Sequence, residues 1–201
     1  MPKDIAVIIL AAGESKRMGQ AKQLLKIGGE SLIRNTIILA QKINPIAIQV
    51  VLGANKELIE AEIKDLECNI VYNRNWKKGM GSSLVTALKN LLESANTPDA
   101  ILMLLVDQPF ISLAHLRALV RTYQSNTSPI IATQYNQILA VPAIFDKSLF
   151  KELLELKGDR GARKIIAHHK NKLLAIPFSK ASLDIDTPED FKKAQILFNK
   201  K

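Results

Sequence analysis

The sequence contains little cysteine and few aromatic residues. Cys68 is the only cysteine among 201 residues, which excludes an intrachain disulfide and a metal site built from a cysteine cluster. Such sparse cysteine fits a reducing cytoplasm, where we expect the protein to act. Aromatic residues make up 5% of the chain, which gives little support to nucleic-acid binding by base stacking. We therefore expect no nucleic-acid partner.

Long hydrophobic runs are absent as well. No apolar stretch approaches the ~20 residues that cross a bilayer, so we expect no membrane partner. The start of the chain, MPKDIAVIILAAG, combines Lys3, a short apolar run and small residues, as a signal peptide does. Asp4 and the β-branched character of the run argue instead for a strand.

Basic side chains are present in excess. Lys and Arg outnumber Asp and Glu by 28 to 19, which gives a net charge of +9. That balance suits an acidic ligand, although a solvated basic surface explains it more simply. The hydrophobic content of 47% and the charged content of 23% are ordinary for a globular protein. At this length we expect one domain spanning residues 1–201.

Short apolar runs alternate with amphipathic segments along the chain. The pattern predicts strands at Ile5–Ala11, Ile46–Leu52, Asn69–Tyr72, Ala100–Val106, Ile130–Thr133 and Leu173–Pro177. It predicts helices at Ser31–Lys42, Lys56–Asp65, Ser83–Glu93, Leu113–Tyr123, Leu149–Leu156, Ala162–His169 and Pro188–Phe198. Because several runs are apolar almost throughout, they suit parallel strands covered on both faces. We therefore predict an α/β fold with a three-layer, doubly wound and mostly parallel sheet. The least regular segment, Gln134–Phe145, has room for an extra strand pair.

The loop after the first strand reads LAAGESKRMGQAK. In sheets of this kind, ligands bind beyond the carboxyl ends of the strands. The loop lacks both the Gly-Lys-Ser/Thr of a Walker A loop and the GxGxxG of a dinucleotide-binding turn. Small residues at Ala11, Ala12 and Gly13 let a phosphate approach the backbone. Three side chains can reach such a phosphate: Ser15, Arg17 and Lys22. An exposed basic loop without a ligand is the structural alternative, and this loop alone leaves both open.

The loop after the third strand, NRNWKKGMGSS, is rich in small residues. Gly79 and Gly81 suit a tight loop, and Ser82 or Ser83 can cap the helix that follows. A helix cap explains one serine but not the small residues that precede it. A loop that wraps around the flat base of a nucleotide would need such small residues. Trp76 could stack on a ligand, although core packing is the commoner role of a single tryptophan.

Several aspartates remain once helix capping has been accounted for. Asp107 ends an apolar run in ILMLLVDQP, and Ser112 lies closer to the next helix than Asp107 does. In SLDIDTPED, Thr187, Pro188 and Asp190 form a capping-box pattern. Asp184 and Asp186 are left over, and Asp186 lies on the loop side of the cap. Two carboxylates with no His or Cys nearby suit Mg²⁺ rather than zinc. The histidines lack the i, i+4 spacing of a zinc helix, so we expect ordinary surface residues at His115, His168 and His169.

Together these stretches resemble the nucleotidyltransferases similar to molybdenum cofactor cytidylyltransferases and guanylyltransferases. The resemblance covers nearly the whole chain and rests on five motifs in order, LAAGESKRMGQAK, GMGSSL, DQP, GDRGAR and DIDTPED. Gln108 after Asp107, with the last two motifs, looks more like the cytidylyl branch. The resemblance implies a Rossmann-like nucleotide-diphospho-sugar transferase fold. It also implies transfer of CMP from CTP to molybdopterin with release of pyrophosphate and with Mg²⁺ as cofactor, and it suggests a molybdoenzyme or chaperone as a further partner.

The resemblance also implies roles for individual residues. The nucleotide would be held by Leu10, Ala11, Ala12, Gly13 and Ser15, and its base and ribose would contact Asn73, Gly79, Met80 and Ser83. The phosphates would meet Arg17 and Lys22. The metal would be bound by Asp107 and Asp186, and Asp107 would also belong to the nucleotide-binding residues. The catalytic residues would be Arg17, Lys22 and Asp107.

A third loop, LKGDRGARKII, carries the prediction for the acceptor. Gly158 and Gly161 bracket Asp159 and Arg160 in a pattern that also fits a simple turn between helices, with Asp159 as a cap. Cations near the start of a helix oppose the helix dipole, and a bound anion would offset that. We therefore predict that the phosphate of the acceptor binds at Arg160 or Arg163.

Three other functions are compatible with parts of the sequence. The same chemistry could use GTP or another acceptor, such as a sugar, polyol or alcohol phosphate. An NAD(P)-dependent oxidoreductase would share the fold type but would normally carry GxGxxG after its first strand. A non-catalytic protein that delivers a cofactor would have no need of Asp107 and Asp186 as metal ligands.

Overall fold

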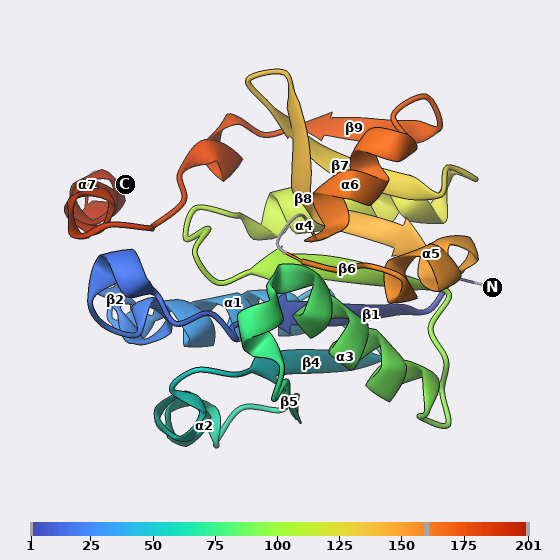
Figure 1. The fold of residues 1–201 in the computed structure, drawn as a ribbon. Helices are drawn as coiled ribbons and strands as arrows, with labels where there is room; N and C mark the ends of the chain where they lie inside the picture. Colours follow the sequence, from blue (N-terminus) through green and yellow to red (C-terminus); the bar gives the residue numbers. More distant parts are fainter. Residues whose placement is uncertain (1, 159–160, 200–201) are drawn as a thin grey trace.

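A seven-stranded, mostly parallel sheet forms the centre of the protein (Figure 1). The computed structural model describes residues 2–158 and 161–199. The strand order is β5-β4-β1-β6-β8-β7-β9. The strands are β1 (Ile5–Leu10), β4 (Ala47–Leu52), β5 (Asn69–Tyr72), β6 (Ala100–Leu105), β7 (Ile130–Tyr135), β8 (Ile138–Asp146) and β9 (Leu173–Pro177). Only β8 runs against its neighbours β6 and β7. A small hairpin joins β2 (Lys26–Ile27) to β3 (Glu30–Ser31).

Helices cover both faces of the sheet and give the fold three layers (Figure 1). One face is covered by α1 (Leu32–Gln41), α2 (Lys56–Ile63) and α4 (Leu113–Gln124), and α7 (Pro188–Asn199) packs beyond the sheet beside β2. The other is covered by α3 (Met80–Leu92), α5 (Phe150–Leu154) and α6 (Gly161–His168). Because β1 lies between the two layers, Ile5, Val7 and Ile9 join one core and Ala6 and Ile8 the other. The predicted three-layer α/β arrangement is confirmed.

The irregular segment forms one extra strand rather than a strand pair. β7 extends to Tyr135 and turns through Asn136 and Gln137 into β8. Both turn residues have positive φ, 46° and 64°, as two-residue hairpin turns of the primed type require. Glycine usually marks the second of these positions. Because Gln137 stands there instead, no local pattern predicts this hairpin.

Helix α3 begins three residues earlier than the apolar pattern predicted. Gly79 lies at its N-cap with φ 98° and ψ 177°, and the helix starts at Met80. Neither serine caps it, contrary to the prediction for Ser82 or Ser83. The Ser82 hydroxyl donates to the Gly79 and Asn75 carbonyl oxygens, so it supports the loop instead. Ser112 does cap α4, with its Oγ accepting from the His115 N–H at 3.2 Å.

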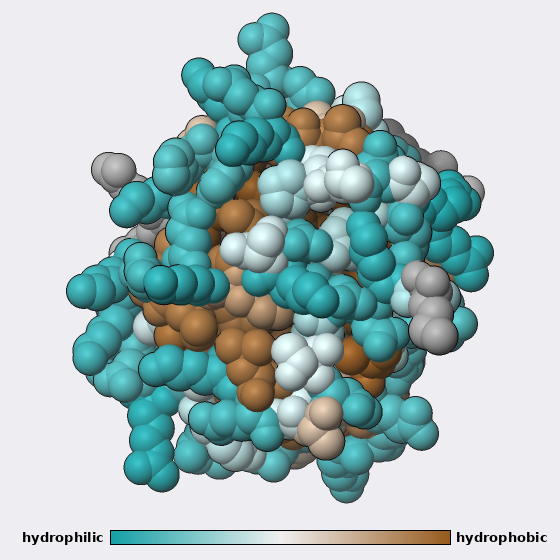
Figure 2. Space-filling view, turned by 90° about the vertical axis from the view of Figure 1, so that its right-hand side faces the viewer, coloured by the Kyte–Doolittle hydropathy of each residue, from teal (hydrophilic) through white to brown (hydrophobic). Residues whose placement is uncertain are grey.

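The parallel strands all end at one edge of the sheet, on the left in Figure 1. The opposite side, where β1 begins, presents mostly hydrophilic side chains around smaller apolar areas (Figure 2). Within residues 2–158 and 161–199, none of the helices has the length and apolar character needed to cross a bilayer.

Candidate functional site

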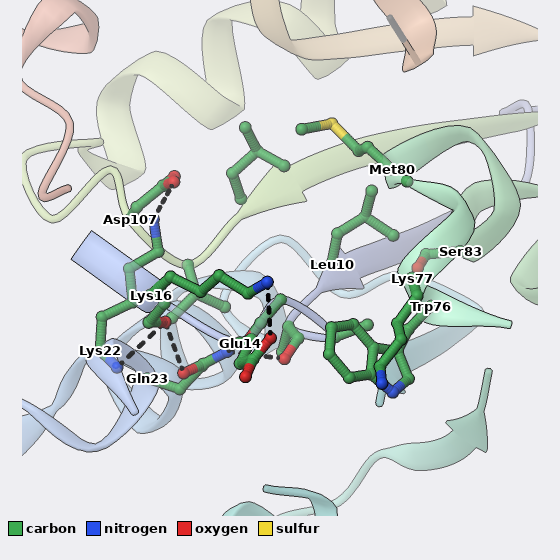
Figure 3. Close-up of a pocket in the computed structure, with 17 residues that line it drawn as sticks. Leu10, Glu14, Lys16, Lys22, Gln23, Trp76, Lys77, Met80, Ser83 and Asp107 are labelled. Carbon is green, nitrogen blue, oxygen red and sulfur yellow. Dashed lines mark hydrogen bonds and ion pairs between the residues drawn. The ribbon is translucent and has the colours of Figure 1, made fainter. Parts of the chain in front are cut away.

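A pocket of about 730 Å³ opens where β1 and β6 end (Figure 3). The loop after β1 forms one wall, the segment between β5 and α3 forms the opposite wall, and the end of β6 forms the floor. Ten of the twelve residues predicted to bind the nucleotide line it: Leu10, Ala11, Ala12, Gly13, Ser15, Lys22, Gly79, Met80, Ser83 and Asp107. Seven lining residues were not predicted to bind it: Glu14, Lys16, Gln23, Trp76, Lys77, Leu105 and Val106.

Gln23 holds the loop after β1 in shape. Its side chain is 2% exposed, and its Nε2 donates to the carbonyl oxygens of Ala11 and Gly13, both at 2.8 Å. The Ser15 hydroxyl donates to Gln23 Oε1 at 3.4 Å and accepts from the Lys22 N–H at 3.3 Å. Ser15 itself has φ 59°. These hydrogen bonds hold the backbone of the loop in place. The space beside Gly13 is open, because a Cβ built there would meet no atom within 4 Å. No motif marks Gln23 in the sequence, because its role depends on a fold-back that only the structure shows.

Trp76 forms part of the opposite wall and also packs against the core cluster beneath it. Trp76 and the backbone of Ala12 both lie close to Gly53. A Cβ at Gly53 would lie 2.6 Å from Trp76 Cβ and 2.8 Å from the Ala12 carbonyl oxygen, so this packing requires glycine. Lys77 Nζ lies over the Trp76 ring, 5.5 Å from its centroid. The tryptophan therefore packs against the core and also lines the pocket, while its stacking on a ligand stays a prediction.

Asn73 lies behind this wall rather than in it. Its side chain is 3% exposed, and its Nδ2 donates to Ser82 Oγ at 2.8 Å and Ser83 Oγ at 3.0 Å. Asn73 is therefore not among the residues that line the pocket, and its contact with base and ribose stays a prediction. Its amide is used to hold the two serines, of which Ser83 lines the pocket.

Two carboxylates from distant parts of the chain meet at the edge of the pocket. Lys22 Nζ lies 2.7 Å from Asp107 Oδ2 and 3.0 Å from Asp186 Oδ1. Arg17 Nη2 lies 2.9 Å from Asp186 Oδ2. The Ile185 N–H donates to the Asp107 carbonyl oxygen at 2.9 Å, which fixes the two aspartate loops beside each other. Asp107 and Asp186, predicted as one site, are indeed brought together.

The electrostatics of this group favour the charged forms of Lys22 and Asp186. Burial alone lowers the pKa of Lys22, but the charges and hydrogen bonds of Asp107 and Asp186 outweigh it and raise the pKa above its usual value. Burial alone raises the pKa of Asp186, but Lys22 and Arg17 outweigh it and lower the pKa. The two cations and two anions balance, so a bound triphosphate would bring negative charge that these groups do not neutralise.

The donor atoms suit a hard divalent cation. Asp107 Oδ1 is buried and has no hydrogen-bond partner among residues 2–158 and 161–199. Burying such an oxygen unpaired is costly, and a metal ion would satisfy it. Carboxylate oxygens alone are the ligand set of Mg²⁺ or Mn²⁺ rather than of zinc. The residues present therefore fit the predicted metal.

The predicted residues Arg17 and Arg163, like Asp186, lie outside the pocket lining. The Arg17 side chain is 71% exposed and reaches the site only through Asp186. Arg163 is exposed in the first turn of α6. The other acceptor candidate, Arg160, and the cap at Asp159 lie outside the described residues. The loop that carries them is nevertheless close to the nucleotide loop, because the Gly81 N–H donates to the Gly158 carbonyl oxygen at 3.0 Å.

The prediction that all three histidines lie on the surface is wrong for His115. Its side chain is 4% exposed, stacks on Phe178 with ring centroids 4.3 Å apart, and bonds to Thr133 Oγ1 at 2.7 Å. Thr133 already donates its proton to the Pro142 carbonyl oxygen, so its oxygen accepts from His115 Nε2–H. The i, i+4 spacing of histidines indicates zinc binding and contains no information on burial, so it did not predict this position. The capping box of Thr187 and Asp190 is confirmed.

Comparison with known proteins places the chain among nucleotidyltransferases. The family model described as MobA-like NTP transferase domain matches residues 7–173, which include the whole pocket lining. The purine catabolism protein PucB of Bacillus subtilis (strain 168) is 30% identical over 198 residues, 92% of this chain and 92% of PucB. The nicotine blue oxidoreductase of Paenarthrobacter nicotinovorans is 29% identical over 196 residues, 90% of this chain and 92% of the relative. Bifunctional protein GlmU of Francisella philomiragia is 32% identical over 130 residues, 64% of this chain and only 28% of GlmU.

Solved structures share the fold over almost the whole chain. The Rv0371c homologue from Mycobacterium sp. strain JC1 has a TM-score of 0.83 at 25% identity, covering 98% of this chain and 97% of its own. The manganese complex of Mycobacterium tuberculosis Rv0371C has a TM-score of 0.80 at 23% identity, with 96% and 98% covered. The molybdopterin-guanine dinucleotide biosynthesis protein A of Archaeoglobus fulgidus has a TM-score of 0.69 at 18% identity, with 98% and 100% covered. At such low identity the last two show a common fold.

Proposed function

Because the chain belongs to the MobA-like NTP transferase domain family, we propose that it transfers the CMP group of CTP to molybdopterin and releases pyrophosphate. The coarser activity, nucleotidyl transfer, is that of the family. The nucleotide and the acceptor are the parts that we propose. We also propose that residues 1–201 act as one domain in the cytoplasm, with a molybdoenzyme or a chaperone receiving the product.

The observation that carries this proposal is the meeting of Lys22, Asp107 and Asp186 beside the pocket. Nucleotidyl transfer needs opposite charges close together, since a cation must meet the phosphates while carboxylates hold a metal. A side chain that attacks the phosphorus is not required, because phosphoryl transfer depends mainly on positioning and charge neutralisation. This chemistry therefore assigns no nucleophilic role to the side chains that line the pocket.

In the proposed reaction, a phosphate oxygen of the acceptor forms a bond to the α-phosphorus of CTP. The bond from that phosphorus to the bridging oxygen breaks, and pyrophosphate leaves with the bond's electron pair. The loop from Ala11 to Ser15 would hold the triphosphate against its backbone, which Gln23 keeps in place. Lys22 would turn from the carboxylates toward the phosphates, and Arg17 would approach them from outside. The wall with Trp76, Met80 and Ser83 would receive base and ribose.

Asp107 and Asp186 are the residues that would hold the metal, with Asp107 Oδ1 as one ligand. A bound Mg²⁺ would supply charge neutralisation for the phosphates and orientation of the triphosphate. The manganese complex of Rv0371C, which has the same fold, supports a divalent cation in this kind of protein. Mg²⁺ is our choice among such cations because it commonly accompanies nucleoside triphosphates.

The preference for CTP rests on the motifs DQP, GDRGAR and DIDTPED. In the structure, Gln108 of the first motif is buried, and its Nε2 donates to the carbonyl oxygens of Ala181 and Val141 at 3.1 and 3.4 Å. Gln108 is not among the lining residues, so any effect on the choice of base is indirect. It would act by fixing the segment that leads to Asp186.

One relative raises a redox alternative at the same pocket, since its name is nicotine blue oxidoreductase. The loop after β1 has glycines only at 13 and 19 and therefore lacks the GxGxxG spacing of a dinucleotide-binding turn. The edge of the pocket does combine the cation Lys22 with the carboxylates Asp107 and Asp186, which nucleotidyl transfer uses and hydride transfer does not need. We therefore place nucleotidyl transfer first.

The test is a two-step assay on the purified chain. Binding of CTP, GTP, ATP and UTP is measured by calorimetry with and without Mg²⁺, and each nucleotide is then incubated with molybdopterin. We expect the tightest Mg²⁺-dependent binding for CTP, release of pyrophosphate, and a product heavier than the acceptor by one CMP in mass spectrometry. Pyrophosphate release with GTP and not with CTP would contradict the proposed preference for the cytosine base. Release with sugar or alcohol phosphates alone would contradict the acceptor. Oxidation of NADH or NADPH without pyrophosphate release would support the redox alternative.

A further inference from the structure

A second cluster of metal-binding side chains lies away from the pocket, between α5 and α6. Glu152 comes from α5, and His168 and His169 come from the end of α6 and the turn after it. One ligand atom from each lies within 4.8 Å of the other two. His168 Nδ1 lies 3.1 Å from Glu152 Oε1, and His169 Nε2 lies 2.6 Å from Glu152 Oε2. Each histidine thus faces its own oxygen of one carboxylate.

The donor set differs in kind from that of Asp107 and Asp186. Two imidazole nitrogens and one carboxylate oxygen suit Zn²⁺ and other transition metals, whereas Mg²⁺ prefers oxygen ligands only. A zinc ion at ordinary bond lengths would hold its ligands about 3.4 Å apart, so modest side-chain movement would close this group around it. The adjacent histidines also lie ring to ring, with centroids 4.8 Å apart.

From these contacts we infer that Glu152, His168 and His169 bind one zinc-like transition-metal ion, with a fourth position left to water. The different exposures of the two histidines support this inference. His169 is partly buried and His168 is open to solvent, so the ion has both a fixed ligand and a path of entry. Glu152 lies in α5, on the right of Figure 1, and His168 ends α6, whereas the opposite end of α6, at Gly161, faces Met80 of the pocket. The site is therefore separate from the phosphate chemistry.

The position in the chain gives the ion a structural role. Glu152 and His169 are 17 residues apart, and the segment between them contains Gly158, whose carbonyl oxygen accepts from Gly81 N–H. Binding would close this segment into a loop. An ion that binds only the folded chain raises the free energy of unfolding. The ion would thus stabilise the α5–α6 turn that contacts the start of α3.

The experiment uses full-length protein without a histidine tag. The metal content after dialysis against Zn²⁺, in excess Mg²⁺, is compared among four proteins. They are the wild type, a His168→Ala/His169→Ala double variant, Glu152→Gln, and an Asp107→Asn/Asp186→Asn control that removes the predicted magnesium ligands. We expect one zinc per chain in the wild type and in the control. Loss of a direct ligand should weaken binding at least as much as loss of an outer-shell partner, about 10–100-fold.

Two further readouts do not depend on how well the histidine variant folds. Saturating Zn²⁺ should raise the melting temperature of the wild type by at least about 2–4 °C. Co²⁺ added to the wild type should give the visible absorption of a four-coordinate nitrogen and oxygen site. Equal zinc uptake in the wild type and the histidine variant would overturn the inference. So would zinc binding that disappears in the Asp107→Asn/Asp186→Asn control, or Co²⁺ spectra identical to those of the aqueous ion.

Discussion

Lys22 Nζ lies 2.7 Å from the carboxylate of Asp107, across 85 residues of sequence. The ammonium contacts the same aspartate pair that we expect to hold a metal. A divalent cation and Lys22 would therefore compete for Asp107 and Asp186, and metal binding would release Lys22 toward the phosphates. The side chain of Lys22 is only 16% exposed, so this movement would occur inside the site. The relationship ties metal binding to phosphate binding.

Replacement of the two aspartates should separate catalysis from folding. We expect Asp107→Ala and Asp186→Ala to lower metal-dependent transfer by about 10²–10³, which is the usual loss for one electrostatic element of an active site. Each variant should keep its circular dichroism spectrum. Asp65→Ala is the control, because Asp65 pairs with Arg34 on the surface and should leave turnover unchanged. Near-wild-type turnover in either of the first two variants would show that its aspartate is not a metal ligand.

Loss of the cations should affect the phosphates and not the nucleoside. We expect Lys22→Ala and Arg17→Ala to weaken triphosphate binding much more than binding of the nucleoside alone. The loss should be greater for Lys22, since Arg17 is 71% exposed and solvent screens its charge. It should also shrink at high salt, where screening already weakens the wild type. Calorimetry at two salt concentrations measures this, with the exposed Lys192→Ala as control. Equal losses for nucleoside and triphosphate would place both side chains elsewhere.

Two glycines next to the pocket should respond in opposite ways to alanine. A Cβ on Gly13 meets no atom within 4 Å, so Gly13→Ala should change stability by less than about 0.5 kcal/mol. Its methyl group would stand in the phosphate path and lower triphosphate affinity by about tenfold, or 1.4 kcal/mol. A Cβ on Gly53 would collide with Trp76 and the backbone of Ala12, which should cost about 1–3 kcal/mol of unfolding free energy.

Denaturant unfolding and calorimetry of the two glycine variants distinguish these effects. A Gly13→Ala protein that binds CTP as the wild type does would mean that the phosphates do not pass over the loop. A Gly53→Ala protein as stable as the wild type would mean that Trp76 can move away from residue 53 without a loss of unfolding free energy.

The sequence predicted the layers and most of the pocket because local patterns determine them. The strand β1 is apolar on both faces and the helices have apolar stripes, so their order along the chain sets the fold class. Ala11, Gly13 and Gly79 lie where small residues follow strands, which is visible without any structure. The motif DQP pointed to Asp107 for the same reason.

The features that the sequence did not predict depend on contacts between distant segments. Gln23 folds back on Ala11 and Gly13, and Asn73 turns into the protein toward Ser83, although both have ordinary polar side chains in loops. The hairpin after β7 lacks the glycine that usually marks such turns. Burial of His115 depends on Phe178, which comes 63 positions later in the chain. Local periodicity contains none of this information.

His115 should make stability depend on pH in weak acid. Burial lowers its pKa to about 4, compared with an ordinary value near 6.5. Because the unfolded chain then binds a proton more readily than the folded one, the stability is fully present above about pH 6.5 and is lost progressively as the pH falls toward 4. The loss should be about 3 kcal/mol at most. Urea unfolding of the wild type and His115→Gln between pH 7 and 4 measures it, since carboxylates common to both cancel. Parallel curves would show that His115 does not cause the dependence.

Arg163 provides the test of the acceptor side. It is exposed in the first turn of α6, close in sequence to Gly158, which is hydrogen-bonded to Gly81 in the loop next to the pocket. A cation there opposes the helix dipole unless an anion is bound. We therefore expect Arg163→Ala to raise the KM for the acceptor by about 10–100-fold, the value of one charge-assisted hydrogen bond of about 1.5–3 kcal/mol. CTP affinity should stay nearly unchanged. The neighbouring exposed Lys164→Ala is the matched control, because it removes the same charge one position away. A fall in CTP binding, a fall in melting temperature alone, or an equal effect of Lys164→Ala would show that Arg163 does not bind the acceptor's phosphate.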